Sequence, residues 1–371
     1  MLPPSNPLQH NLTLALRCYF PDFRKNQLEL LVLVVVALIQ AQSVKHSKLA
    51  ERVAGVAQFD SALRRIERFF ERHPVTQADI APLVLACLTQ TPLLTLILDR
   101  TNCLGPTTPP HGAGRWKLGK TDINILVLSV LHGKTAIPLL WECLPHSGNS
   151  NAQTRTDLLE DLFCVLDVER VGILLADREF VGAKWFDTLW SWAVPFCIRI
   201  RDDTRVDDVP AGEFFADIEP GQTGLMGHEL WCYGLPLSLA VTLSPEQTRV
   251  IVASNLPVEQ ALFEYRKRWR IECLFRHLKT GGFQLEETHM VDHDKLERLW
   301  CVLVIAYLWC TLLGQPEPIR LKTHGRAAKA VFVAGLNHLT RGLQQTGVLL
   351  EQFVCKLILL LDFSSCKTVG Y

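Results

Sequence analysis

Hydrophobic and polar positions alternate with a helical period in the first part of the chain. Apolar side chains recur every three or four residues, and polar capping residues precede several of these runs. Such a pattern predicts amphipathic helices. The expected helices cover residues 26–42, 43–52 and 61–72. We therefore expect residues 1–85 to form an all-helical domain.

The pattern changes near residue 86, where short and continuous apolar runs begin. Two of these runs, Leu93–Leu98 and Val171–Ala176, are followed directly by Asp99 and Asp177. Continuous apolar runs of this length predict strands that are buried on both faces. Further strands are expected at residues 123–131, 136–141 and 195–200, and helices at 154–168 and 183–192. That order of elements predicts a mixed α/β core with an aspartate at the end of each of the two strands.

A stretch rich in glycine and proline follows these strands. Residues 201–253 contain short apolar runs joined by turn residues, which predicts an inserted β-rich subdomain. Residues 295–371 are mainly apolar, and we expect a helical C-terminal region there. The predicted organisation is a helical domain over 1–85, an α/β core over 86–294 that carries the insertion, and the C-terminal region over 295–371.

One polar row stands out on the segment Glu264–Lys279. This segment contains no glycine or proline, has apolar residues at helical spacing and is followed by Gly281 and Gly282, so it predicts an amphipathic helix with a C-terminal stop. At about 100° per residue, four of its polar side chains share an arc of roughly 60°. These side chains are Tyr265, Arg268, Glu272 and Lys279.

The polar row has two interpretations. It is a solvated helix face, in which an Arg268–Glu272 pair contributes a few tenths of a kcal/mol. Alternatively, a carboxylate between cations holds a metal ion while its neighbours bind the phosphates of a nucleic acid. Asp99 and Asp177 have the same ambiguity, because a single aspartate after a strand is commonly a cap or loop residue. Two such aspartates upstream of the polar row favour the functional interpretation.

The spacing Tyr-x2-Arg-x3-Glu-x6-Lys in this row resembles the signature of bacterial insertion-sequence transposases of the DDE class. The resemblance implies a ribonuclease-H-like catalytic core with Asp99 on its first strand, Asp177 on its fourth and Glu272 as the third acid. It also implies an insertion before the glutamate, which residues 201–253 match. By the same resemblance, Tyr265, Arg268 and Lys279 hold phosphates near the transposon end.

This family resemblance implies a metal-dependent reaction on DNA. Three carboxylates, Asp99, Asp177 and Glu272, are expected to bind two divalent ions, and their oxygen ligands favour Mg²⁺ or Mn²⁺ over zinc. Glu179 is an alternative to Asp177 as ligand, and Glu287 is a weaker alternative to Glu272.

Further DNA contacts are more open. Arg178 and Arg100 are expected either to contact phosphates or to form structural salt bridges. Trp231 in the insertion is a candidate for stacking on a flipped base, although most tryptophans lie in protein cores. Trp269 lies beside the polar row and has the same two interpretations.

Composition limits the partners. The 371 residues are 48% hydrophobic and 20% charged, as in a globular protein, and the formal net charge is zero. A DNA-binding surface must therefore be local, and residues 45–72, with seven Lys or Arg against four acids, are the candidate. The twelve cysteines contain no Cys-x2-Cys pair, which favours small core residues in a reducing cytosol over disulfides or a zinc site.

Membrane insertion is not expected. The longest apolar runs, residues 30–39 and 299–313, are shorter than the roughly 18 to 20 residues that span a bilayer, so they predict buried helices. We expect a cytoplasmic enzyme that binds the terminal inverted repeats of its element as a homodimer, cuts double-stranded DNA and joins the ends to a target. The alternatives are a metal-dependent nuclease of the same fold, a catalytically inactive DNA-binding relative and a helical scaffold protein.

Overall fold

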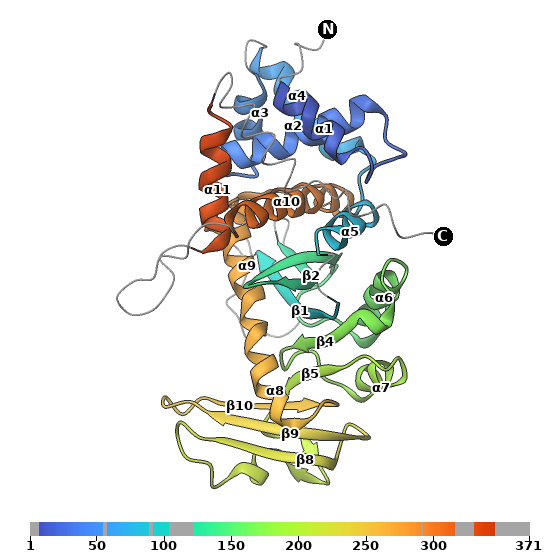
Figure 1. The fold of residues 1–371 in the computed structure, drawn as a ribbon, viewed down its shortest axis with the longest axis vertical. Coiled ribbons are helices and arrows are strands. Elements are labelled where there is room, and N and C mark those ends of the chain that lie inside the picture. The colour runs from blue at the N-terminus through green and yellow to red at the C-terminus, as the bar shows by residue number, and fades with distance from the viewer. Residues whose placement is uncertain are drawn as a thin grey trace.

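The computed structural model describes residues 7–54, 58–88, 92–103, 122–290, 292–315 and 330–345. Helices α1 to α4 gather at one end of the elongated molecule, strands β8 to β10 lie at the other end, and the remaining strands lie between them (Figure 1). Helix α10 crosses the molecule between the first helices and the sheet. The predicted mixed α/β class is confirmed.

The described part of residues 1–85 is helical, as the pattern predicted. The helices are α1 Pro7–Leu16, α2 Lys25–Ala41, α3 His46–Ala54, α4 Phe59–Arg72 and α5 Gln77–Ala86. Helix α5 begins with a capping box, in which the Thr76 backbone N–H donates to the Asp79 carboxylate at 2.9 Å. Arg298 of α10 binds the C-terminal carbonyls of α4, because its Nε donates to His73 O at 2.7 Å. These contacts fasten the helical end to the rest of the protein.

Five strands form the central part of the sheet. They are β1 Leu94–Cys103, β2 Ile123–His132, β3 Thr135–Cys143, β4 Val171–Ala176 and β5 Phe196–Ile200. Strands β1, β2 and β3 are antiparallel, whereas β4 runs parallel to β1 and β5 parallel to β4. Helix α6 Ala152–Phe163 and the short turn η1 Val168–Arg170 precede β4, and helix α7 Ala183–Ser191 connects β4 to β5.

Two predicted boundaries in this region are wrong. Asp99 does not end its strand, because β1 continues to Cys103 and pairs with β2 along this whole stretch. Arg100, the first polar residue after Asp99, remains in the strand because Glu179 and Asn124 bind its side chain. The helix expected over 154–168 ends at Phe163.

The insertion continues the central sheet instead of forming a separate one. Its elements are β6 Arg205–Val206, β7 Val209–Pro210, η2 Glu213–Phe215, β8 Thr223–Cys232, β9 Leu235–Leu243 and β10 Arg249–Ser254. Strand β10 pairs with β5 on one side and with β9 on the other, and the described strands form one sheet in the order β3-β2-β1-β4-β5-β10-β9-β8-β6-β7. With ten and nine residues, β8 and β9 are longer than expected.

The segment that carries the polar row is divided. Helix α8 Val258–Tyr265 passes through a 3₁₀ turn, η3 Arg266–Arg268, into helix α9 Trp269–Lys279, where a single helix over 264–279 was expected. The expected stop after Lys279 is present. A Cβ at Gly282 would lie 2.7 Å from the His277 carbonyl oxygen and from the Phe332 ring, so only glycine fits there. The short turn η4 Leu285–Glu287 follows.

Two helices of the C-terminal region are described, α10 His293–Gly314 and α11 Val331–Gly342. They approach so closely that a Cβ at Gly335 would lie 1.7 Å from the Cys310 carbonyl oxygen. The remainder of the predicted C-terminal region, 316–329 and 346–371, lies outside the described residues.

Among the described helices, α10 has the length and composition to cross a membrane, and α2 with α3 would pass the same test only as one strongly bent span. In α10, 83% of the most apolar window is buried inside the protein. Its partners include α2, α5, α11 and β3. We therefore describe α10 as a core helix, as the sequence predicted.

Candidate active site

The parallel pairing of β1 with β4 brings the two aspartates together. Leu98 of β1 is in register with Ala176 of β4, so the next residues, Asp99 and Asp177, are neighbours at the point where β4 ends. Neighbouring strands lie about 4.8 Å apart. The two carboxylates therefore come from adjacent backbone positions although 78 residues separate them in the sequence.

Asp99 is largely buried and has few partners. Its side chain is 14% exposed, and its Oδ2 accepts a hydrogen bond from Arg268 Nη1 at 2.9 Å. Its Oδ1 accepts from the backbone N–H of Arg100 at 2.8 Å. Burial raises the pKa of Asp99 to about 7, although Arg268 acts in the opposite direction. Burial thus disfavours the charged form of this carboxyl group more strongly than Arg268 favours it.

Asp177 is held by an aromatic hydroxyl and a second arginine. Tyr265 donates its hydroxyl to Asp177 Oδ1 at 3.3 Å, and Arg199 Nη1 lies 3.7 Å from the same oxygen. Burial raises the pKa of Tyr265 above its usual range, so the phenol remains a hydrogen-bond donor. Arg199 was missed in the sequence analysis. A charged residue in the otherwise apolar strand β5 was the available signal, because such a side chain requires a partner.

Glu272 reaches the same place from α9. Arg268 Nη2 donates to Glu272 Oε1, while its Nη1 donates to Asp99. One guanidinium group therefore joins a carboxylate of the sheet to a carboxylate of the helix. The polar row predicted from the sequence faces the two strands, and Asp99, Asp177 and Glu272 converge around Arg268 and Tyr265.

The other residues with predicted roles lie further out. Lys279 donates to the backbone carbonyl of Asn102 in β1 and lies 3.8 Å from Glu286. Arg178 is exposed directly after Asp177. Trp231 in β8 is 58% exposed and Trp269 is 53% exposed, so neither side chain belongs to the core.

The two alternative acids are bound elsewhere. Glu179 forms two hydrogen bonds with Arg100, each of 3.1 Å. Glu287 lies 3.3 Å from Lys45 and connects the N-terminal helices to the segment after α9. Neither of these carboxylates binds a residue of the polar row. Asp177 binds Tyr265, and Glu272 binds Arg268.

The residues of the site match a divalent metal in chemistry but are not arranged as a finished cage. Within the described ranges, no group of three His, Cys, Asp or Glu side chains lies at metal-binding spacing. Arg268 takes the place of a counter-ion between Asp99 and Glu272. The donors are all oxygens, as Mg²⁺ and Mn²⁺ prefer, and a cation bound there would favour the ionised form of Asp99, which burial disfavours. Asp99, Asp177 and Glu272 therefore fit such ions once Arg268 releases a carboxylate.

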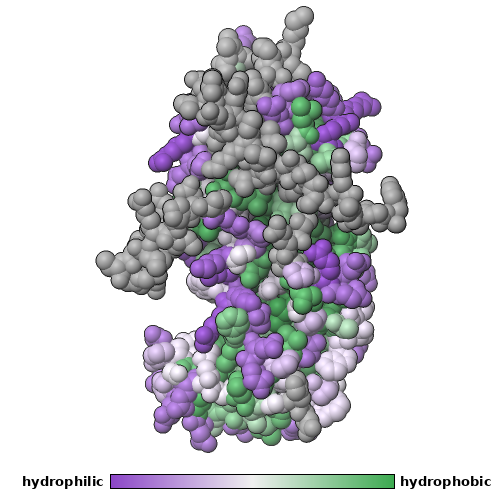
Figure 2. All heavy atoms as spheres, viewed as in Figure 1, coloured by the Kyte–Doolittle hydropathy of each residue, from purple (hydrophilic) through white to green (hydrophobic). Residues whose placement is uncertain are grey.

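A hollow lies beside this region on the surface. In the view of Figure 2, the side of the molecule is hollowed between its main body and the end that carries β8 to β10. Hydrophilic residues border this hollow, and in the same view α8 and α9 run along that side (Figure 1). An elongated polar ligand would thus have access to the helix that carries Glu272.

Comparison with known families supports a specific assignment. Residues 90–309, more than half of the chain, match the family described as the transposase DDE domain. The match extends from the beginning of β1 into α10 and includes all three converging acids. No curated protein matches the chain.

Proposed function

The chain belongs to the transposase DDE domain family, and from this premise we propose that it is the transposase of a bacterial insertion sequence. It would bind the terminal inverted repeats of its element, cleave the DNA strands there and join the freed ends to a target. Asp99, Asp177 and Glu272 are the proposed catalytic triad. The observation that carries the proposal is the convergence of these acids, from β1, β4 and α9, around Arg268.

The fold supports the same proposal. Three antiparallel strands, a helix, a parallel strand, a second helix and another parallel strand give the order expected of a ribonuclease-H-like core. Asp99 lies on the first of these strands and Asp177 directly after the fourth. The insertion lies between the fifth strand and Glu272, as the resemblance to the signature-bearing transposases implies.

The proposed chemistry depends on divalent metal. Two Mg²⁺ or Mn²⁺ ions, when bound by the triad, would supply activation of the attacking oxygen and charge stabilisation for the leaving oxygen. Arg268 and Tyr265 bind carboxylates in the protein without DNA, and both would turn to the phosphates of the strand being cut. A phosphate offers the guanidinium group the same pair of acceptors as a carboxylate. Lys279 would add a positive charge near the end of β1.

The proposed DNA-binding domain is the helical region 1–85. In α4, Arg64, Arg68 and Arg72 follow at intervals of four residues, and all three side chains are exposed. This spacing places them along one helix face, where they can contact successive phosphates. We propose that the protein acts as a homodimer on two DNA ends in the cytoplasm, where the element's DNA is found.

The function can be tested on a duplex that carries the terminal repeat flanking the gene. Wild-type protein with Mg²⁺ should cut at the repeat end and insert the cut end into a supercoiled plasmid. Asp99→Asn, Asp177→Asn and Glu272→Gln should each lower cleavage by at least about 10³-fold while repeat binding persists. Glu287→Gln is the matched control, because this carboxylate pairs with Lys45 outside the site.

The possible outcomes separate the alternatives. Cleavage without insertion into the plasmid would indicate a nuclease. Repeat binding without cleavage by the wild type would indicate an inactive relative. Cleavage that survives Glu272→Gln would show that the third acid is misassigned.

A further inference from the structure

The main-chain ladder between β1 and β4 stops just before the two aspartates. The last residues in register are Leu98 and Ala176, where β4 ends. Asp99 itself remains fixed, because β1 continues and pairs Asp99 with Val127 of β2. Asp177 lies in the turn after β4, beyond the ladder. Main-chain pairing therefore does not hold Asp177 at a set distance from Asp99.

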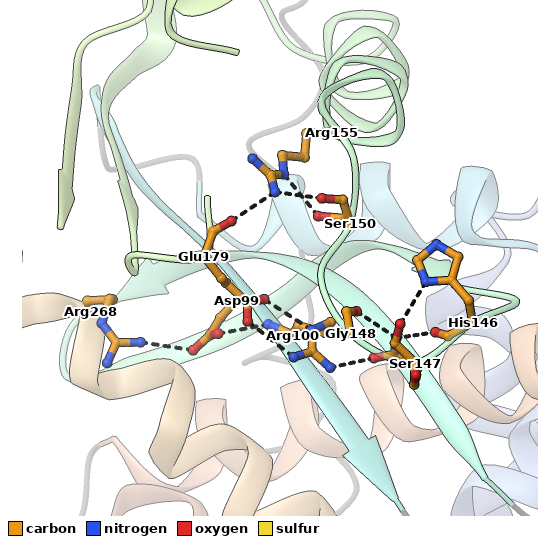
Figure 3. A network of polar contacts seen from close by, with 10 residues as sticks. Asp99, Arg100, His146, Ser147, Gly148, Ser150, Arg155, Glu179 and Arg268 are labelled. Atoms are coloured by element: carbon orange, nitrogen blue, oxygen red, sulfur yellow. Dashed lines mark hydrogen bonds and ion pairs between the residues drawn. The ribbon is translucent and has the colours of Figure 1, made fainter. Parts of the chain in front are cut away.

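A side-chain bridge joins the same two chain segments just beyond the aspartates. Arg100 donates to Glu179 through Nε and Nη2, each at 3.1 Å. The two side chains are only 16% and 21% exposed. Parallel paired bonds of this kind fix orientation as well as distance. Because neighbouring strand residues point to opposite faces, Arg100 acts from the face opposite Asp99 (Figure 3).

Both ends of this bridge are anchored. Arg100 Nη1 donates to Asn124 Oδ1 of β2 at 2.9 Å, and the Asn124 amide in turn donates to the carbonyls of His146 and Gly148 at 2.6 and 3.1 Å. The arginine is therefore attached to β2 as well as to its own strand. The bridge thus fixes the side chain of Glu179 relative to strands β1 and β2.

Arg155 at the beginning of α6 holds the turn that contains Glu179. Its side chain is buried, and its Nη2 donates to the Glu179 carbonyl at 2.9 Å and to the Ser150 carbonyl at 2.6 Å. Its guanidinium carbon also lies 5.0 Å from the centre of the Phe180 ring. The Phe180 backbone N–H closes the turn by donating to Asp177 O at 2.9 Å. The turn is thus held on its main chain by Arg155 and on its side chain by Arg100.

We infer that Arg100 and Glu179, supported by Arg155, form a clamp that sets the separation of Asp99 and Asp177 and so shapes the metal site. The inference rests on the proposed function, in which these aspartates bind metal. Arg100 and Glu179 act through the aspartates and are positioning residues. Residues that orient metal ligands typically affect metal affinity or activity by about 10- to 100-fold.

Electrostatics offers a test of this positioning role. If Arg100 and Glu179 affected the site only through their charges, removing the Arg100 cation would strengthen binding of a divalent cation. Removing the Glu179 anion would weaken it. A clamp requires both residues, so loss of either should weaken metal binding. The sign of the Arg100 effect therefore separates positioning from charge.

The experiment titrates Mn²⁺ into the full-length protein and follows free Mn²⁺ by electron paramagnetic resonance. Arg100→Gln and Glu179→Gln should each weaken Mn²⁺ binding by about 10- to 100-fold. The double variant should lose no more than the weaker-binding single variant, because either substitution already opens the clamp. Lys45→Gln, which removes a salt bridge to Glu287 outside the site, is the matched control and should bind like the wild type. Circular dichroism melting curves establish that each variant is folded.

Three results would overturn the clamp: tighter binding by Arg100→Gln, single variants within twofold of Lys45→Gln, or losses that multiply in the double variant. Cleavage of the terminal repeat by the wild type, measured in parallel, keeps the two proposals separate. Wild-type cleavage together with any of the three results removes the clamp and leaves the transposase function. Mn²⁺ binding by the wild type without cleavage removes the function, while the variants still decide on the clamp. Absence of both removes both proposals.

Discussion

Arg268 Nη1 lies 2.9 Å from Asp99 Oδ2, although 169 positions separate the two residues in the chain. The same guanidinium group donates to Glu272, four residues further along its own segment. Arg268 is therefore the counter-ion of two proposed metal ligands. In the protein without DNA, a metal ion must compete with this arginine for the carboxylates.

Arg268→Gln should consequently tighten Mn²⁺ binding by the protein without DNA. It should also lower the free energy of unfolding in the absence of metal by about 1 to 3 kcal/mol, because Asp99 loses its charged partner. Urea denaturation and Mn²⁺ titration measure the two effects. Arg266→Gln is the control, since Arg266 is exposed in the same 3₁₀ turn. Weaker Mn²⁺ binding by Arg268→Gln, or equal effects of both variants, would contradict this account.

Trp231→Ala should weaken binding of the cleaved repeat end and leave the fold intact. The indole is 58% exposed on β8, so its removal should change the free energy of unfolding by less than about 1 kcal/mol. Loss of base stacking should cost about 1 to 3 kcal/mol of binding, which fluorescence anisotropy with a labelled repeat measures. Trp190→Ala, at a 42% exposed tryptophan in α7, is the control and should bind normally. Unchanged binding by Trp231→Ala would remove its proposed stacking role.

Gly335→Ala should destabilise the contact between α10 and α11. The added Cβ would lie 1.7 Å from the Cys310 carbonyl oxygen, and backbone on the facing helix cannot yield as a flexible side chain can. We expect a loss of about 2 to 3 kcal/mol in the free energy of unfolding, measured by urea denaturation. Gly227→Ala in β8 should be nearly neutral, because nothing lies within 4 Å of the position that the added Cβ would take. Equal stability of the two variants would show that the helices separate at little cost.

The pH dependence of stability should include a contribution from His277. Burial, helped by Arg276, lowers the pKa of His277 from 6.5 to about 4. Between these values the unfolded chain binds a proton that the folded protein does not. The stabilising contribution is therefore complete above about pH 6.5 and is lost as the pH falls towards 4.

Replacing His277 tests this contribution. The free energy of unfolding of His277→Gln, measured by urea denaturation, should fall less than that of the wild type between pH 6.5 and 4, with a difference on the order of 2 kcal/mol. Glutamine keeps a polar group near the Tyr307 hydroxyl, which lies 3.3 Å from His277 Nδ1. Parallel pH profiles for the two proteins would show that His277 does not contribute.

Local sequence patterns predicted the elements whose burial is continuous. Strand β4 has the predicted bounds because both of its faces are covered, so its residues form one continuous apolar run that ends before Asp177. The Arg268–Glu272 contact follows from helical spacing on one segment. The continuation of β1 beyond Asp99 was missed because the partners of Arg100, Glu179 and Asn124, lie far away in the sequence.

Long-range pairing set the remaining features. Nothing in the sequence of β10 indicates that it pairs with β5, so the insertion was expected as a separate unit. The 3₁₀ turn at Arg266–Arg268 contains neither glycine nor proline, so the local sequence does not predict it. The contact of Arg199 with Asp177 likewise depends on the neighbouring positions of β4 and β5. The catalytic and DNA-binding roles of the site residues remain predictions.

The dispersion of the three acids along the chain also has a consequence during synthesis. Glu272 follows Asp99 by 272 − 99 = 173 residues. At about 5 to 20 residues per second, a ribosome needs roughly 9 to 35 s to travel from one codon to the other. A nascent or prematurely terminated chain that ends before α8 would carry the proposed DNA-binding helices and both aspartates without Glu272 or Arg268. Such a fragment would also lack α10, against which α2 and α5 pack, so neither the site nor the helical end of the molecule is complete until synthesis has passed α10.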